Sequence, residues 1–210
     1  MASNNDAFAR EVDEELREDR LKSVWRRYGL LIGAAAVALV VGTAAAVGWQ
    51  AWQERQRMAD ARAFDQALQT DGQALATADA LLEVADDAAT GYRLVAQLNA
   101  AQLQAAAGEV DAARDTLRAL AADGAVPTLY RDLARLLDIA AGADTASPDA
   151  MLAELQPLAA AGEPWRHSAR ELVAAAQLEA GDTAAARTTL VRIVDDAETP
   201  QALRSRAREL

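Results

Sequence analysis

The chain has few of the side chains on which catalysis and metal binding depend. Its 210 residues include no cysteine and a single histidine, which excludes disulfides, thiolate zinc sites and thiol chemistry. Neither a glycine-rich phosphate-binding motif nor His-Glu-x-x-His occurs. His167 stands just inside an expected helix start without a paired nucleophile or second ligand, which favours a surface or capping role. We therefore predict that the protein is not an enzyme and has no catalytic residue, metal ligand or cofactor site.

Aromatic residues and strand patterns are also scarce. Aromatics make up 4% of the chain, and β-branched or aromatic residues nowhere alternate with polar ones over more than a few positions. Alanine, which has the highest helix propensity, dominates instead, so we predict an all-α fold. The net charge is −11, and residues 29–210 hold 15 basic and 25 acidic side chains. Such an acidic body disfavours nucleic acid and anionic lipid surfaces as partners.

One long apolar run stands out against this background. Residues 29–49 carry no charge, and Thr43 is their only polar side chain. As a helix this run covers about 30 Å, the thickness of the hydrocarbon core of a bilayer. Aromatic rings, which favour the headgroup level, bracket the run at both ends: Trp25, Tyr28, Trp49 and Trp52. The sequence therefore predicts one transmembrane helix.

The distribution of positive charge predicts the orientation of this helix. Six Lys or Arg residues lie within 20 positions before the run and three within 20 positions after it, so we expect a cytoplasmic N-terminus. A cleaved signal peptide is the alternative, and the small residues at 43–46 would suit a peptidase. The long acidic segment before the run and a run longer than about 7–15 residues argue against it. The predicted organisation is a cytoplasmic head (residues 1–28), a transmembrane helix (29–52) and a periplasmic domain (53–210) of a single-pass inner-membrane protein.

The head has the pattern of an amphipathic helix. Phe8, Val12 and Leu16 recur at every fourth position, and the other faces are strongly charged. Two interpretations fit this pattern equally. The head is either a solvated helix near the membrane surface or a docking site for a cytosolic or membrane partner. Its clustered carboxylates follow a helix surface rather than a pocket, which favours solvation over metal or acid–base chemistry.

The body repeats itself with a period of 36–37 residues. Pro127, Pro164 and Pro200 are spaced by 37 and 36 positions, and Thr90 and Gln53 lie one and two periods earlier. Proline is favoured at the first turn of a helix, so each of these positions predicts a helix start. Since the first of them adjoins the apolar run, we expect the membrane helix to continue into the first repeat helix.

A second signal has an offset of 73 residues, or two periods. Residues 108–117 align with 181–190, and 127–135 align with 200–208. We expect Gly108 and Gly181 to end the first helix of a pair with a positive φ. The middle unit has a longer turn, and Pro157 should kink or shorten its second helix. The final segment predicts a capping helix that covers the last repeat through Leu203, Ala207 and Leu210.

These residues resemble the tetratricopeptide repeat. In that family a small residue of the first helix packs against an alanine of the second, and a large residue follows. The matching positions are Ala101, Ala113 and Leu117 in one copy and Ala174, Ala186 and Leu190 in the other. Gln97 and Gln104 stand where the family has Trp and Tyr, so we expect a divergent version that stacks into a superhelix. Trp165 and Tyr130 either line a groove or, as is commoner at helical spacing, belong to the core.

The layout as a whole is similar to the YfgM-type ancillary subunits of the SecYEG translocon in Gram-negative bacteria. The most specific part is the acidic motif at residues 8–17, followed by Asp19-Arg20-Leu21-Lys22 and Trp25-Arg26-Arg27-Tyr28-Gly29. The resemblance implies an inner-membrane protein that associates with the SecYEG translocon and a periplasmic prolyl-isomerase-type chaperone and assists exported proteins. Two alternatives stay open: a membrane-tethered tetratricopeptide scaffold for cell-envelope or division complexes, and an accessory that positions a hydrolase.

Overall fold

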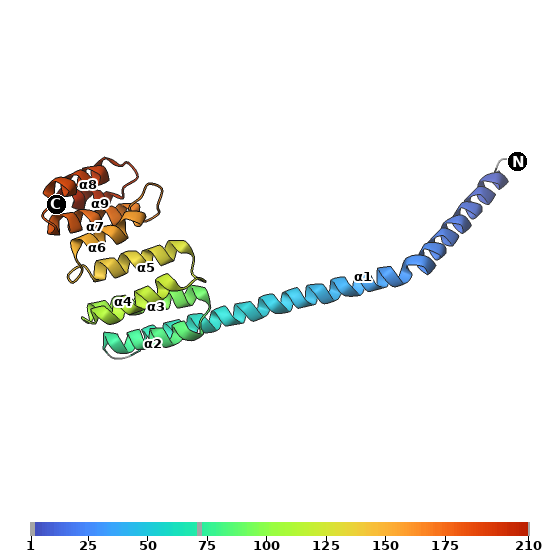
Figure 1. The fold of residues 1–210 in the computed structure, drawn as a ribbon. Coiled ribbons are helices and arrows are strands. Elements are labelled where there is room, and N and C mark those ends of the chain that lie inside the picture. The colour runs from blue at the N-terminus through green and yellow to red at the C-terminus, as the bar shows by residue number, and fades with distance from the viewer. Residues whose placement is uncertain (1–2, 71–72, 210) are drawn as a thin grey trace. The chain divides into compact units, whose positions relative to one another are not determined.

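The computed structural model describes the backbone of residues 3–70 and 73–209, and the side chains of these residues from Trp25 onward. Over these residues the chain forms nine α-helices and no strand, which confirms the all-α prediction. In chain order the helices are α1 (Ser3–Leu68), α2 (Ala74–Asp87), α3 (Thr90–Ala106), α4 (Val110–Ala122), α5 (Thr128–Ala141), α6 (Pro148–Leu158), α7 (Arg166–Glu179), α8 (Thr183–Asp195) and α9 (Gln201–Glu209) (Figure 1).

The contacts within the chain divide it into two units, Met1–Gln56 and Arg57–Leu210. The first unit is helical throughout its described residues and belongs to α1. The stretch of α1 from Trp25 to Leu68 is long and apolar enough to cross a membrane. The predicted domain boundaries at residues 28 and 52 fall inside α1 and remain predictions. The amphipathic face expected from Phe8, Val12 and Leu16 lies outside the described side chains.

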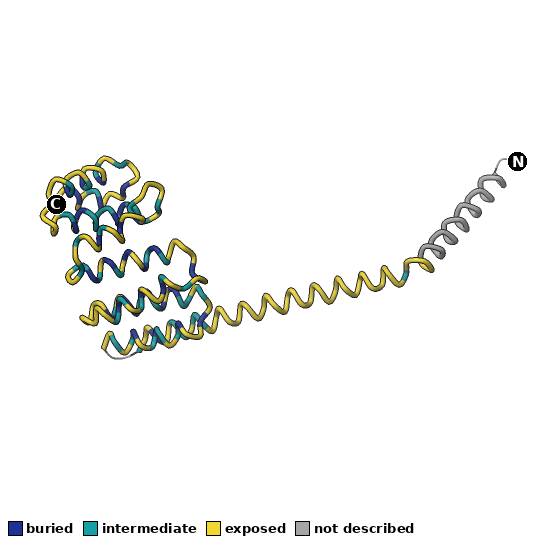
Figure 2. The backbone as a smooth tube through the Cα atoms, in the orientation of Figure 1, coloured by how far each residue is buried: buried dark blue, intermediate teal, exposed yellow. Residues whose placement is uncertain are grey.

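Large apolar side chains of the first unit are exposed all around the helix. Leu30 is 89% exposed, and Leu39 and Val40 are 72% and 64% exposed, so residues 25–56 are yellow almost throughout in Figure 2. A water-soluble helix buries one apolar stripe, whereas a helix in lipid is apolar on every face. The Thr43 hydroxyl donates a hydrogen bond to the carbonyl of Leu39 at 2.8 Å, which satisfies it without water.

The second unit is a stack of antiparallel helix pairs (Figure 1). The C-terminal part of α1 pairs with α2, and the next pairs are α3 with α4, α5 with α6 and α7 with α8, followed by α9. The helix starts expected at Thr90, Pro127, Pro164 and Pro200 are confirmed to within two residues, because α3 begins at Thr90 and α5, α7 and α9 each begin just after their proline. The prolines therefore precede the first turn rather than occupying it, and Pro127 is the N-cap of α5.

Two glycines end the first helices of two pairs, as predicted. Gly108 and Gly181 have φ angles of +88° and +78°. After α3 the Gly108 amide donates to Ala105 and the Glu109 amide to Gln104, and the same two hydrogen bonds recur 73 residues later after α7. This Schellman motif satisfies the last carbonyls of each helix and reverses the chain within three residues.

The middle pair departs from this pattern as expected. Six residues join α5 to α6, and the Ser147 hydroxyl caps α6 by accepting a hydrogen bond from the Ala150 amide. Pro157 lies in the last turn of α6, which has 11 residues where α4 and α8 have 13. Proline lacks the amide that would continue the helix, so the shorter helix follows from its position.

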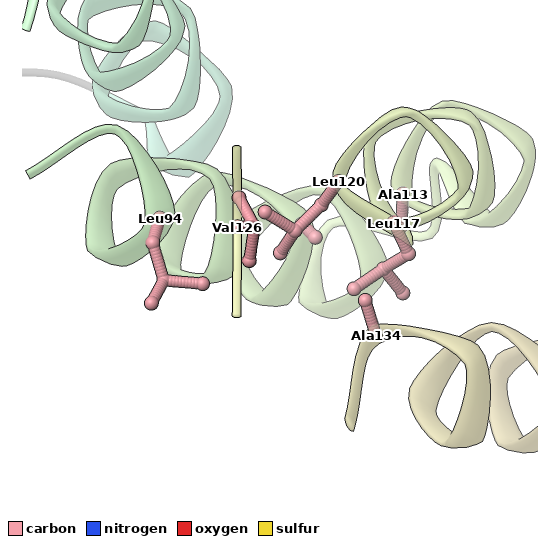
Figure 3. Packing of buried hydrophobic residues seen from close by; sticks show 7 residues of the cluster. Leu94, Ala113, Leu117, Leu120, Val126 and Ala134 are labelled. Atoms are coloured by element: carbon pink, nitrogen blue, oxygen red, sulfur yellow. The ribbon is translucent and has the colours of Figure 1, made fainter. Parts of the chain in front are cut away.

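The core consists of small clusters between neighbouring pairs rather than one continuous centre. Figure 3 shows Leu117 and Leu120 of α4 directed toward Ala134 and Val126, and Leu120 is fully buried. Some residues expected to be buried are exposed, because the buried stripe of each first helix is offset from the predicted one: Ala105, Leu129 and Ala140. Each small cluster depends on the next pair, as in other repeat proteins.

The last helix covers the end of the stack. Leu203 and Ala207 of α9 are 6% and 5% exposed, and they pack with Ala174, Leu190 and Ile193. The predicted cap is therefore confirmed for the described residues, which do not include Leu210. An apolar face of α7 and α8 that would otherwise meet water is buried by α9.

Candidate functional site

The histidine that the sequence singles out is a buried structural group. His167 is 8% exposed, contrary to the surface or capping role expected for it. Its Nδ1 atom lies 3.0 Å from the Thr199 hydroxyl and 3.8 Å from an Asp196 carboxylate oxygen. Burial of the imidazole, followed by the positive charge of Arg166, lowers the pKa of His167 from its ordinary value, although the Asp196 carboxylate opposes the shift.

The contacts of His167 do not form a catalytic triad. In such a triad the nucleophile and the orienting carboxylate meet opposite ring nitrogens, so that the ring passes a proton between them. Here Thr199 and Asp196 both approach Nδ1. Among the described residues no group of three or more His, Asp or Glu side chains could hold a metal ion. The side chains that carry function must therefore be sought among binding surfaces.

The clearest binding surface is an apolar groove between the first helices of two successive pairs. It has a volume of about 440 Å³ and is formed by α3, α4 and α5. We call it the α3–α5 groove. Its lining residues are Leu98, Asn99, Ala101, Gln102, Ala105, Ala113, Leu117, Leu133, Leu137, Ala140 and Ala141.

None of these lining residues is charged, although a quarter of all residues in the chain are. Leu98 and Leu133 are half-buried, and Leu137 is 39% exposed. Two amides stand among them. Asn99 donates from Nδ2 to the carbonyl of Val95 at 2.8 Å, and Gln102 is exposed. A hollow of leucine and alanine with a few amides suits an apolar side chain whose flanking peptide groups need hydrogen bonds.

The same place in the second copy of the repeat is closed. Residues 73 positions after Leu98 and Leu133 are Glu171 and Arg206. The Arg206 guanidinium donates from Nε and Nη2 to the two carboxylate oxygens of Glu171, at 2.7 and 2.8 Å. This bidentate hydrogen bond raises the pKa of Arg206. An ion pair thus joins α7 to α9 where two leucines face the α3–α5 groove.

The equivalence of the two copies is visible in conserved side-chain geometry. The Thr116 hydroxyl donates to Oε1 of Gln104 at 3.0 Å, and Thr189 donates in the same way to Gln177 at 2.8 Å. In each copy a second-helix threonine is thereby tied to the last turn of the first helix. The difference between Leu98 and Glu171 is therefore a difference at one structural position.

Two other hollows have charged linings. One, of about 390 Å³, is formed by α1 and α2 and includes the carboxylates of Asp60, Glu83 and Asp87. The other, of about 700 Å³, lies along α7 and α8, and two of its charged residues, Arg170 and Asp196, pair with each other at 3.4 Å. Neither offers the uninterrupted apolar surface of the α3–α5 groove.

The two aromatic residues noted in the sequence have different positions. Trp165 is half-buried in the cluster beneath α5, α6 and α7, and its indole donates to the Leu129 carbonyl at 2.7 Å. Tyr130 is 38% exposed on α5, so its assignment to the core is wrong. The sequence interpretation did not single out Leu98 and Leu133 as binding residues. Comparing side chains at the offset of 73 would have shown both of them replaced by charged residues.

Comparison with known proteins identifies the repeats. A family model described as a tetratricopeptide repeat-like domain matches residues 22–172. No curated protein and no solved structure matches the chain.

Proposed function

Because the chain belongs to the tetratricopeptide repeat-like domain family, we propose that it is a non-catalytic protein-binding module anchored in a membrane. The observation that supports this most directly is the α3–α5 groove, which is apolar and uncharged. A partner would insert an apolar side chain between Leu98 and Leu133. Burial of a leucine-sized side chain there would contribute about 2 kcal/mol, which suits reversible binding of polypeptide segments.

The second copy of the repeat supplies the change that tests this binding site. The double substitution Leu98→Glu and Leu133→Arg places the Glu171–Arg206 ion pair in the α3–α5 groove. A photoreactive residue at exposed Gln102 reports on binding in intact membranes. We expect crosslinked partners with the otherwise unchanged chain and at least a tenfold loss in the double variant.

A matched control alters the ion pair itself. Glu171→Leu with Arg206→Leu changes four charged or apolar positions to four apolar ones across the two copies and leaves the α3–α5 groove unaltered. Crosslinking from Gln102 should then stay at the level of the unchanged chain. Equal crosslinking in all three proteins would contradict the α3–α5 groove as the binding site.

The membrane anchor in this proposal is α1. Its apolar stretch is exposed on all sides, and Trp49 and Trp52 lie at its C-terminal end with ring centroids 5.1 Å apart. From the excess of Lys and Arg before the stretch we propose a cytoplasmic N-terminus and a periplasmic C-terminal domain in a bacterial inner membrane. Protease added to spheroplasts should degrade the C-terminal domain, and full protection of that domain would overturn the orientation.

The partners that we propose come from the resemblance of the head and span to YfgM-type subunits. They are the SecYEG translocon and a periplasmic prolyl-isomerase-type chaperone, beside which the protein would assist exported chains. The alternative is a tethered scaffold for cell-envelope or division complexes. Mass spectrometry of the Gln102 crosslinks separates the two, because recovery of division or cell-wall proteins without translocon subunits would favour the scaffold.

A further inference from the structure

A second surface lies at the far end of the stack, on α8 beside α9. It borders a hollow of about 510 Å³, and we call it the α8–α9 surface. Its lining residues are Leu178, Thr183, Arg187, Leu190, Val191, Val194, Asp195, Ala207 and Arg208. Two of the apolar residues are unusually exposed for their size, Val191 at 48% and Leu178 at 37%. The charged residues of the lining are two arginines and one aspartate.

The first copy of the repeat shows what fits on such a surface. There α4 takes the place of α8, and α5 packs against it. Asp138 of α5 accepts hydrogen bonds from Arg114 at 2.7 Å and from Arg118 at 3.2 Å, both of α4. The carboxylate of Asp138 is only 13% exposed. An apolar helix that carries a carboxylate is therefore held against α4 by two charge-assisted hydrogen bonds.

The same surface of α8 lacks this partner in the part of the chain that the structure describes. Arg187 is 73 positions after Arg114 and has no ion pair or hydrogen bond with a described side chain. Val191 takes the place of Arg118. The described residues of α9 cover α8 through Leu203 and Ala207, beside Leu190 and Ile193, but bring no carboxylate to Arg187.

We propose that the α8–α9 surface is a docking site for an amphipathic helix of a partner protein, one that carries Asp or Glu beside small apolar residues. Its carboxylate pairs with Arg187 as Asp138 pairs with Arg114, and its apolar residues cover Val191 and Leu178. Three features support this occupant. The site continues an interface already present between α4 and α5, the arginine has no described partner, and the excess of one positive charge in the lining attracts a carboxylate despite Asp195. This site is separate from the α3–α5 groove and extends the proposed function.

The chemistry of the site can be tested with a probe taken from the chain itself. Residues 138–141, Asp-Ile-Ala-Ala, are appended after Leu210 in the full chain held in detergent micelles. If the α8–α9 surface accepts this segment, Tm rises by roughly 2–4 °C relative to an Asn-Ile-Ala-Ala extension. The difference should vanish in Arg187→Gln. Equal Tm values for the Asp and Asn extensions would overturn the role of Arg187.

The natural partner is tested in membranes with a photoreactive residue at Val191. We expect a crosslink to a helical segment containing Asp or Glu, reduced at least tenfold by Arg187→Glu and unaffected by Arg192→Glu, which reverses an exposed charge on the same helix away from this lining. The Asp-Ile-Ala-Ala extension should compete with the partner and reduce the crosslink. Absence of a crosslink, a crosslink within the same chain, or equal crosslinking in Arg187→Glu would overturn the proposal. Crosslinking from Gln102 tests the α3–α5 groove independently, so failure of one site is distinguishable from failure of the other.

Discussion

The helix pairs α3–α4 and α7–α8 have the same backbone plan and opposite surfaces. Both end their first helix at a glycine with positive φ, and both tie a second-helix threonine to a first-helix glutamine. Yet the leucines that line the α3–α5 groove become an ion pair between α7 and α9. The comparison teaches that the shared positions hold the fold, while the positions that differ decide which surface is open to a partner.

The interior differs as well at one pair of positions. Leu94 and Val126 pack together in the first copy. Their counterparts 73 residues later are His167 and Thr199, which share a hydrogen bond of 3.0 Å. A contact between two apolar side chains is thus replaced by a buried polar pair, which must keep its hydrogen bond to avoid a desolvation cost. The second copy is therefore the one whose stability depends on solution conditions.

Removal of the central core side chain of each copy should have the largest effect. Leu120 and its counterpart Ile193 are both fully buried. We expect Leu120→Ala to lower the free energy of unfolding by about 3–5 kcal/mol, because of lost burial and the cavity left behind. Ile193→Ala should cost about 2–3 kcal/mol, since the short α9 can shift toward the cavity. Urea denaturation of the full chain in micelles measures both losses.

The exposed Val191 provides the control for these core substitutions. Val191→Ala should change the free energy of unfolding by less than about 0.5 kcal/mol. If Ile193→Ala costs as much as Leu120→Ala, α9 is held as firmly as α5, and the contrast between an inner and a terminal pair is wrong.

The next effect concerns the clamp between α4 and α5, which only the first copy has. Asp138→Asn leaves Arg114 and Arg118 without their carboxylate, and we expect a loss of about 1.5–3 kcal/mol. Gly142→Ala should act on the same clamp, because an added Cβ would lie 2.4 Å from the Arg114 guanidinium carbon. Urea denaturation again measures the loss.

The counterpart of Arg114 shows whether this effect belongs to the clamp. Arg187→Gln should change the stability of the isolated protein by less than about 0.5 kcal/mol, since no described side chain pairs with Arg187. Equal losses for Asp138→Asn and Arg187→Gln would mean that α8 already holds a partner of its own.

The sequence predicts the local features of both copies well. Prolines and glycines act through their own backbone geometry, so Pro127 and Gly108 mark a helix start and end without knowledge of the neighbours. The surfaces are harder, because the openness of the α3–α5 groove depends on side chains from three helices. Hydrophobicity alone placed Tyr130 in the core and missed the buried environment of His167, which Thr199 creates from 32 residues away.

Substitution of the two turn glycines should give smaller and equal effects. Gly108 and Gly181 have no atom within 4 Å of an added Cβ, so only the positive φ opposes alanine. We expect Gly108→Ala and Gly181→Ala each to cost about 1–2 kcal/mol. Gly91→Ala is the control, because Gly91 lies in the first turn of α3 with open space around it, and alanine there should stabilise the protein by about 0.4–1 kcal/mol. Unequal losses at the two turns would show that the turns are not equivalent.

The smallest effect should appear on mild acidification and only in the second copy. The pKa of His167 is lowered in the folded protein, mainly by burial and then by the charge of Arg166, against the opposing carboxylates of Asp196 and Glu198. Folding therefore favours the neutral ring, so its contribution to stability is complete above the ordinary pKa of about 6.5 and is lost as the pH falls toward the folded value. The loss cannot exceed about 1.4 kcal/mol per pH unit for one proton.

Amide hydrogen exchange of α7–α9 and of α3–α5 at pH 7.5 and 5.5 separates the two copies. Exchange should accelerate in α7–α9 and stay constant, after correction for the intrinsic pH dependence, in α3–α5. His167→Leu with Thr199→Val restores the apolar pair of the first copy, Leu94 with Val126, and should abolish the difference. Because His167 is the only histidine in the chain, a pH effect that persists in this double variant would have to come from carboxylates such as Asp196. The pKa of Asp196 is lowered, first by its hydrogen bond from the Glu198 amide, and it would lose its stabilising charge only at more acidic pH.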